Sequence, residues 1–254
     1  MFDPWYILAF TITFCSMFIE SIGGFGGGIF AMSLLVLFLP LPLSAVAYAF
    51  ASTTGLLYLV WKLRHNFPLK QVLSVVAGRI AGVSLGVYLL SLALHIYAKL
   101  LLTGVIVFIA LKEIIVPDKA RTDLPQEIRI NTYVGLGLGF LSGILNGWIN
   151  MGGPPLILYA YRSFEGRSAR RFLIACFFLS FPFKVIMYYA RDLITVQSWV
   201  LFCYLVPGTI LGTWIGHRFQ NRMNRELFVR VAWFILLGLG IILGGNTLLS
   251  FLKP

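Results

Sequence analysis

The chain has 254 residues, of which 59% are hydrophobic and 11% are charged, whereas soluble domains average about 25% charged residues. So few polar side chains cannot cover the surface of a water-soluble fold, and the composition therefore indicates an integral membrane protein. The formal net charge of +11 comes from basic residues in short loops between apolar runs, with no basic face interleaved with aromatic residues, so we expect membrane lipid and no nucleic acid as a partner.

The first part of the chain, residues 1–111, is expected to form one transmembrane repeat. No basic residues precede its first apolar segment and no small-residue cleavage site follows it, which predicts an uncleaved span rather than a signal peptide. The second segment follows a glycine-rich break and is shorter than the about 20 residues that a helical span needs. The five predicted segments are 5–22, 28–39, 43–61, 71–94 and 98–111.

Residues 112–131 form a polar stretch that we expect to be a central cytoplasmic loop. Beyond it, residues 132–254 show the same pattern and are expected to form the second repeat, whose second segment is again short and again follows a glycine-rich break. The sequence thus predicts an all-α polytopic membrane protein of two repeats, each with about five hydrophobic segments. The segments of the second repeat are 132–148, 154–161, 172–190, 196–215 and 231–252.

The basic residues decide the expected topology. If each pair of segments around a glycine break returns the chain to its starting side, 15 basic residues gather on one face of the membrane and three on the other. If each pair crosses only once, the two faces carry nine each. Because positively charged loops stay in the cytoplasm, the first arrangement is predicted, with both termini outside. Five segments per half is an odd number, so we expect the two repeats to be inverted relative to each other. The expected location is a bacterial or archaeal plasma (inner) membrane.

Two glycine arrays support a duplication. Three glycines recur at every fourth position in the fourth segment, and three more do so in the corresponding part of the ninth. Small residues at this spacing let helix backbones approach closely in lipid, so we expect helix packing rather than substrate contact as their role. The arrays are Gly78, Gly82 and Gly86, and Gly208, Gly212 and Gly216.

The two breaks are the most informative stretches. The first spans residues 20–28 with five glycines, and the second spans residues 146–155 and ends in Gly-Gly-Pro-Pro. Glycine at this density cannot hold a regular helix cheaply, and non-helical backbone at membrane depth is buried in protein or lines a watery cavity. Because Pro154 and Pro155 suit a first helical turn, each break is expected to end one helix and begin the next. Two helix N-termini brought together would attract an anion near the midplane, although tight packing or a kink is the other interpretation.

Three ionisable residues need separate interpretation. Lys184 has no acid within four residues, and it is either the counter-ion of an anionic substrate or a side chain that snorkels or pairs with a distant acid. Glu20 borders the first break, where it either carries a coupling proton or pairs with Lys184 or Arg79 as a structural contact. Arg79 lies about 12 Å of helix rise from the cytoplasmic end of its segment, so we expect it to snorkel to the interface.

In its length, its two glycine-rich breaks, its central polar loop and its glycine arrays, the chain resembles the TauE/SafE sulfite exporter family. The resemblance covers nearly the whole chain and implies a small two-repeat carrier for sulfite, organosulfonates or related organic anions. It also implies that the hydroxyl-bearing stretch Ala51-Ser52-Thr53-Thr54 is comparable to the one that follows the first motif of the family. The residues that match the family's breaks are Gly23, Gly24, Gly26, Gly27, Gly28, Gly147, Gly152, Gly153 and Pro154.

The expected function is secondary transport of a small anion by alternating access, as one repeat rocks against the other. Asn146 and Asn150 would offer amide donors, Lys184 would supply charge, and Glu20 is the candidate for a coupling proton. An anion channel on the same fold is one alternative, and an integral membrane enzyme or assembly factor is another. The predicted substrate-binding residues are Gly26, Gly27, Gly28, Ser52, Thr53, Asn146, Asn150, Gly152, Gly153, Pro154 and Lys184.

We predict no enzymatic activity, metal or cofactor. An enzyme would need clustered His, Asp or Glu on facing segments, and Glu20 is the only acid within one. The three cysteines lie far apart in apolar runs, and the three histidines lie at segment ends without the spacing of metal ligands. No phosphate-binding loop is found, so ATP-driven transport by this chain is not expected. Glycine faces serve contacts within and between chains alike, which leaves a homo-oligomer open.

Overall fold

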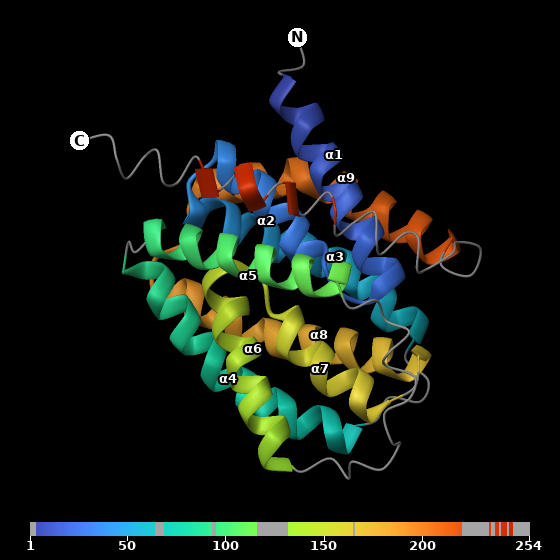
Figure 1. The fold of residues 1–254 in the computed structure, drawn as a ribbon. Helices are drawn as coiled ribbons and strands as arrows, with labels where there is room; N and C mark the ends of the chain where they lie inside the picture. The colour runs from blue at the N-terminus through green and yellow to red at the C-terminus, as the bar shows by residue number, and fades with distance from the viewer. Residues whose placement is uncertain are drawn as a thin grey trace.

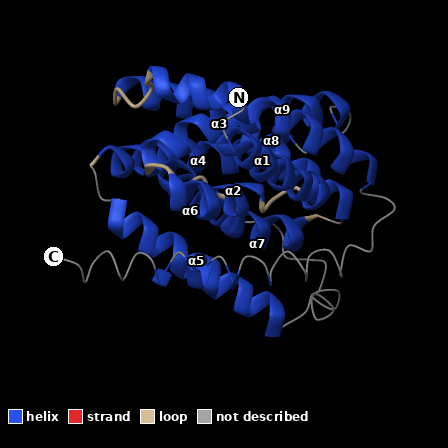
Figure 2. Cartoon of the chain, turned by 90° about the horizontal axis from the view of Figure 1, so that it is seen from above, coloured by secondary structure: helices blue, strands red, loops and turns tan. Residues whose placement is uncertain are grey.

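The computed structural model describes residues 4–63, 69–92, 95–115, 132–164 and 166–219, together with single positions between 234 and 245. These residues form α-helices joined by short turns, and no strand occurs among them (Figures 1 and 2). The helices are α1 (Pro4–Gly23), α2 (Gly27–Phe38), α3 (Leu41–Leu63), α4 (Leu69–Ser91), α5 (His95–Ile115), α6 (Thr132–Ile149), α7 (Gly153–Ser163), α8 (Gly166–Ala190) and α9 (Val196–Phe219).

The predicted membrane architecture is confirmed. Helices α3, α4, α6, α8 and α9 each contain a stretch long and apolar enough to cross a bilayer. The two helices expected to be short have 12 residues in α2 and 11 in α7. Nine of the ten predicted segments correspond to these helices, whereas the tenth, 231–252, and most of the central loop, 112–131, lie largely outside the described residues.

The helices group into two bundles that exchange one helix between the halves of the sequence. The most extensive contacts join α4 to α6 and α1 to α9, which lie side by side in Figure 1. We call α1, α2, α3 and α9 the first bundle, and α4, α6, α7 and α8 the second bundle. Contacts between the bundles run mainly through α3 and α8, and α5 lies along one edge, where it touches α2 and α6 (Figure 2). Exchanging α1–α4 with α6–α9 reproduces the principal pairings, as a two-fold relation between the halves would require. Inverted orientation remains a prediction.

The glycine arrays lie inside the two closest helix pairs, which is the packing role expected of them. A Cβ atom at Gly82 on α4 would overlap the carbonyl oxygen of Phe140 on α6. The second array behaves alike, since a Cβ at Gly212 on α9 would overlap the carbonyl oxygen of Phe14 on α1. Side chains at these positions would separate the helices, so the glycines permit direct backbone contact.

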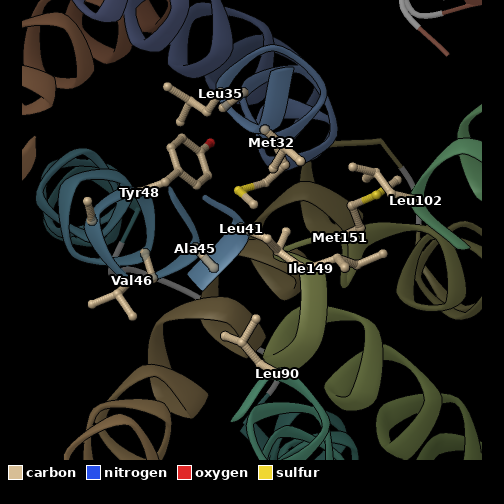
Figure 3. Packing of buried hydrophobic residues seen from close by; sticks show 14 of the residues in the cluster. Met32, Leu35, Leu41, Ala45, Val46, Tyr48, Leu90, Leu102, Ile149 and Met151 are labelled. Carbon is tan, nitrogen blue, oxygen red and sulfur yellow. The ribbon is translucent and has the colours of Figure 1, made fainter. Parts of the chain in front are cut away.

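The largest buried apolar cluster joins the two bundles next to the breaks. Figure 3 shows Met32 of α2 and Tyr48 of α3 in one packed group with Ile149 and Met151 from the second break. All four side chains are at most 2% exposed. This packing holds the first turns of α2 and the residues before α7 in a fixed relation, and thereby positions the site described below.

Candidate functional site

Each break ends one helix with a left-handed residue and begins the next within three residues. In the first break, Gly24 has φ +78° and its N–H donates to the carbonyl oxygen of Glu20 at 2.7 Å. In the second, Asn150 takes the left-handed position with φ 57°, and the N–H of Met151 donates to the carbonyl oxygen of Leu145 at 3.1 Å. Both are standard helix C-terminal caps, in which glycine or asparagine relieves the cost of positive φ. Pro154 and Pro155 then occupy the first turn of α7, as predicted.

The two breaks touch. A Cβ at Gly28 would overlap the carbonyl oxygen of Asn150, and a Cβ at Gly153 would lie 3.6 Å from the Cβ of Phe25. The absence of a side chain at Gly28 therefore lets the first turn of α2 rest on the backbone of the second break. The N-terminal ends of α2 and α7 consequently border one space between the bundles, in line with the predicted meeting of two helix ends.

A cavity occupies this space. Its volume is about 60 Å³, which holds a few water molecules or one small anion. The first bundle contributes Glu20, Phe25, Gly26, Gly28, Ile29, Tyr48, Ala49, Ser52, Thr53 and Leu56 to its lining. The second bundle contributes Asn146, Asn150, Met151, Gly152, Gly153, Phe177, Ser180, Phe181 and Lys184.

Lys184 on α8 is the cation of the cavity wall. It is 4% exposed, so it does not snorkel, and no ion pair joins it to an acid among the described residues. Its Nζ donates to the backbone carbonyl of Asn146 at 2.7 Å, to Oδ1 of the same residue at 2.6 Å, and to Oδ1 of Asn150. These neutral oxygens satisfy its donors but leave its charge without a counter-ion.

The two asparagines orient Lys184 rather than simply offering amides to the cavity. Both Oδ1 atoms accept from Nζ of Lys184, and Nδ2 of Asn150 donates to the carbonyl oxygen of Ala45 on α3 at 2.8 Å. The predicted amide donor of Asn150 is thus engaged across the bundle interface. Asn146 keeps its side-chain amide at the cavity lining, where an anion could accept from it.

Glu20 lies on the opposite wall, near the end of α1. It is 7% exposed, and a Cβ at Gly27 would overlap its Oε2. The described residues give its carboxylate neither a hydrogen bond nor an ion pair with Lys184 or Arg79, so the structural pairing considered from the sequence is not found. Tyr48 also lines the cavity, and its hydroxyl lies 2.7 Å from Oγ of Ser16.

The expectation that Arg79 snorkels is wrong. Its side chain is 0% exposed, because α6 and α8 cover the face of α4 on which it lies. Its Nε donates to Oγ of Ser180 at 3.1 Å and its Nη1 to Oγ of Ser142, which in turn donates to the carbonyl oxygen of Gly152 at 2.5 Å. The guanidinium lies 4.7 Å from the ring centre of Phe177, and its Nη2 has no hydrogen-bond partner among the residues that the structure describes. Arg79 therefore stands directly behind the cavity wall.

A family model described as "Sulfite exporter TauE/SafE" matches residues 9–243. The chain belongs to the TauE/SafE family. No curated protein and no solved structure matches it at a significant level. TauE/SafE is a family of membrane transporters, which supports a transporter of anions and fits the expectation that the chain is not an enzyme. In the described residues no three His, Cys, Asp or Glu side chains are grouped so as to hold a metal ion.

Most residues proposed from the TauE/SafE resemblance and from the breaks surround the cavity, although their role in binding stays a prediction. The exceptions are Gly27, which packs against Glu20 and Ser16, and Pro154, which lies in the first turn of α7 outside the lining. The sequence interpretation missed Tyr48 and Ser180, each one helical turn before a proposed residue. Following the helix face back by four positions from Ser52 leads to Tyr48, and from Lys184 to Ser180, so helix periodicity would have found both residues. The aromatic lining residues Phe25, Phe177 and Phe181 carried no such signal.

Proposed function

We propose that this protein is a secondary carrier for a small oxyanion, with sulfite or a short organosulfonate as the expected substrate. The observation that carries the proposal is the burial of Lys184 at the cavity wall, where its Nζ donates to neutral oxygens and no acid among the described residues pairs with it. An unpaired cation inside a membrane protein is costly, and a bound anion would compensate it. The family to which the chain belongs supports the substrate class.

The helix ends add to this preference for anions. The first turns of α2 and α7 begin at Gly27 and Gly153, whose neighbours Gly26, Gly28 and Gly152 line the cavity with exposed backbone. Unpaired N–H groups at helix N-termini carry partial positive charge and suit an oxyanion. The hydroxyl groups of Ser52 and Thr53 donate to the carbonyl oxygen of Ala49 at 3.2 and 2.7 Å, so they would turn from it towards a bound anion. Together with the amide of Asn146, they would complete the donors. Their hydroxyl and amide hydrogens select for acceptor-rich ligands.

Alternating access would then be a motion of the two bundles rather than of the two sequence repeats. The cavity lies between the bundles, and the closest helix pairs, α1 with α9 and α4 with α6, lie within them. Because the glycine contacts bring backbones together, each bundle would move as a unit. Opening would occur along α3 and α8, first towards one side of the membrane and then towards the other.

Uptake into proteoliposomes tests the proposal. Labelled sulfite, sulfate and methanesulfonate would be offered with and without a pH gradient to wild type, Lys184→Ala and Gly153→Leu. The matched controls are Lys62→Ala, which changes an exposed lysine, and Gly137→Leu, which changes an exposed glycine with no atom within 4 Å of its Cβ position.

We expect saturable uptake of at least one anion, accelerated by unlabelled anion on the opposite side, retained in both controls and lost in both cavity variants. Uptake that rises linearly with concentration and shows no acceleration would indicate a channel instead. No uptake of any of the three anions by demonstrably folded protein would refute the substrate class.

A further inference from the structure

A second buried cation, Arg79, lies directly behind the wall of the cavity. Arg79 does not line the cavity itself, but two residues that do line it contact its guanidinium. Its Nη1 would lie 3.1 Å from a Cβ at Gly152, and its Nε donates to Ser180. Ser180 lies one helical turn before Lys184 on α8, so the two cations lie near the same part of the wall. In the low dielectric of a protein interior, a charge one residue layer away still contributes strongly to the potential in the cavity.

Within the part of the chain that the structure describes, neither cation has an acidic partner. Arg79 is bound by two serine hydroxyls and Lys184 by carbonyl and amide oxygens, all of them neutral. Among the described residues that line the cavity, Glu20 is the only acid. With Lys184 and Arg79 both protonated, the site carries a net charge of +2 when Glu20 is protonated and of +1 when Glu20 is ionised.

Other titratable groups around Glu20 do not change this count. Tyr48 on α3 is a phenol held by Ser16, and α2 contributes no titratable side chain. On α8, Arg170 packs against Gly24, and His217 lies near the end of α9. Neither of them lines the cavity, and neither does Gly24, whereas Lys184 and the Ser180 partner of Arg79 do.

Building on the proposed transport function, we propose that the occupied site is electrically balanced as a unit, in which the bound anion and Glu20 together supply two negative charges to Lys184 and Arg79. A divalent anion is then bound with Glu20 protonated, and a monovalent anion with Glu20 ionised. The physical reason is the cost of enclosing net charge within a membrane protein. A divalent substrate would therefore carry one proton with it and a monovalent substrate none.

Binding of two anions whose charges do not change with pH tests the balance. Equilibrium binding of labelled sulfate, which is divalent, and methanesulfonate, which is monovalent, would be measured between pH 5.5 and 8 on purified full-length protein. The variants are Glu20→Gln, Arg79→Gln and Arg79→Lys, and Asp192→Asn, which changes an exposed acid, is the control.

In wild type and in Asp192→Asn, sulfate affinity should fall as the pH rises, by up to about tenfold per pH unit for one linked proton, whereas methanesulfonate affinity should change little. Glu20→Gln should bind each anion equally well at every pH and should keep at pH 8 the preference for sulfate that wild type shows at pH 5.5. Arg79→Gln should lose preference for sulfate, and Arg79→Lys, which restores the charge without the fork of donors, should regain it.

Three results would overturn the inference. If both anions bind wild type with the same pH dependence, or if Glu20→Gln keeps the wild-type dependence, the charge balance is wrong while anion binding stands. If Arg79→Lys is folded, as judged by circular dichroism, but prefers sulfate over methanesulfonate no more than Arg79→Gln does, the role of Arg79 is geometric. Its charge then does not belong to the balance. If neither anion binds wild type at any pH, the proposed function fails together with the inference.

Discussion

Gly82 lies at the centre of the contact between α4 and α6, and replacing it with alanine tests whether backbone contact holds the second bundle together. The new Cβ would overlap the carbonyl oxygen of Phe140 and lie 2.9 Å from the amide nitrogen of Ile144, where ordinary contact begins at 3.4 Å. Both are backbone atoms, which cannot rotate away as a side chain would. Relief therefore requires the two helices to move apart along an interface that also contains Gly78, Gly86 and three glycines of α6.

Overpacking of this kind costs about 1–3 kcal/mol, and alanine regains about 1 kcal/mol of helix propensity over glycine. Because the obstructing atoms are main chain, we place the cost at the upper end and expect a net loss of about 1–2 kcal/mol. For a protein of about this size, 1 kcal/mol corresponds to roughly 2–4 °C in Tm. Gly82→Ala should thus lower Tm by about 2–8 °C.

The measurement is thermal unfolding in detergent, followed by circular dichroism at 222 nm. Gly137→Ala is the matched control, because Gly137 lies on α6, the partner helix of α4, but has no atom within 4 Å of its Cβ position. The control should leave Tm unchanged or raise it through helix propensity alone. If both variants unfold at the same temperature, the glycine array does not set the distance between α4 and α6, and our account of the bundles is wrong.

Substitutions at two further positions, Asn150 and Ser142, test the second break and the buried network that contacts it. Asn150→Gly keeps the left-handed backbone but removes the side chain that joins Lys184 to Ala45, whereas Asn150→Ala also adds the strain of a positive φ. We expect the alanine variant to be about 1–2 kcal/mol less stable than the glycine variant by thermal unfolding. Equal stability of the two variants would contradict the capping role. Ser142→Ala leaves Nη1 of Arg79 and the carbonyl of Gly152 without their shared partner and should lower the free energy of unfolding by about 1–3 kcal/mol. The control Ser91→Ala removes an exposed hydroxyl bonded within its own helix and should cost less than about 0.5 kcal/mol. Similar losses of stability in both variants would show that the buried network adds nothing.

The sequence was sufficient for the helices and breaks because their signals are local. Glycine density and the two prolines located both helix ends to within one or two residues, since they act on the backbone where they occur. Lys184 and Glu20 were both proposed from the sequence as site residues, and both line the cavity. The partners of these side chains could not be predicted, because Asn146 reaches Lys184 from 38 residues away.

Arg79 shows why the remainder could not be predicted. Its distance from the end of its own segment favoured snorkelling, and that argument holds for an isolated helix in lipid. It failed because α6 and α8 cover this part of α4, and the identity of the covering helices depends on which helices pair. Pairing is a long-range property that a glycine array permits without naming the partner, so the sequence suggested two repeats as the moving bodies where the contacts form two exchanged bundles.

The exchanged bundles make a prediction that distinguishes them from the repeats. Phe50 on α3 and Phe181 on α8 face each other across the bundle interface with ring centres 5.7 Å apart, whereas Tyr58 on α3 and His217 on α9 lie 5.9 Å apart within the first bundle. Pairs of cysteines would replace each pair of rings in a chain whose three native cysteines have been changed to serine or alanine, and a short bifunctional thiol reagent would link them.

If the bundles move against each other, the link between positions 50 and 181 should abolish exchange in proteoliposomes, and cleavage of a reducible linker should restore it. The link between positions 58 and 217 should leave exchange intact, because it joins helices of one rigid body. Motion of the sequence repeats predicts differently, since α3 belongs to the first repeat and α9 to the second, and both links would then block. Exchange that survives the link between positions 50 and 181 would contradict both descriptions, because α3 and α8 belong to different bodies in each.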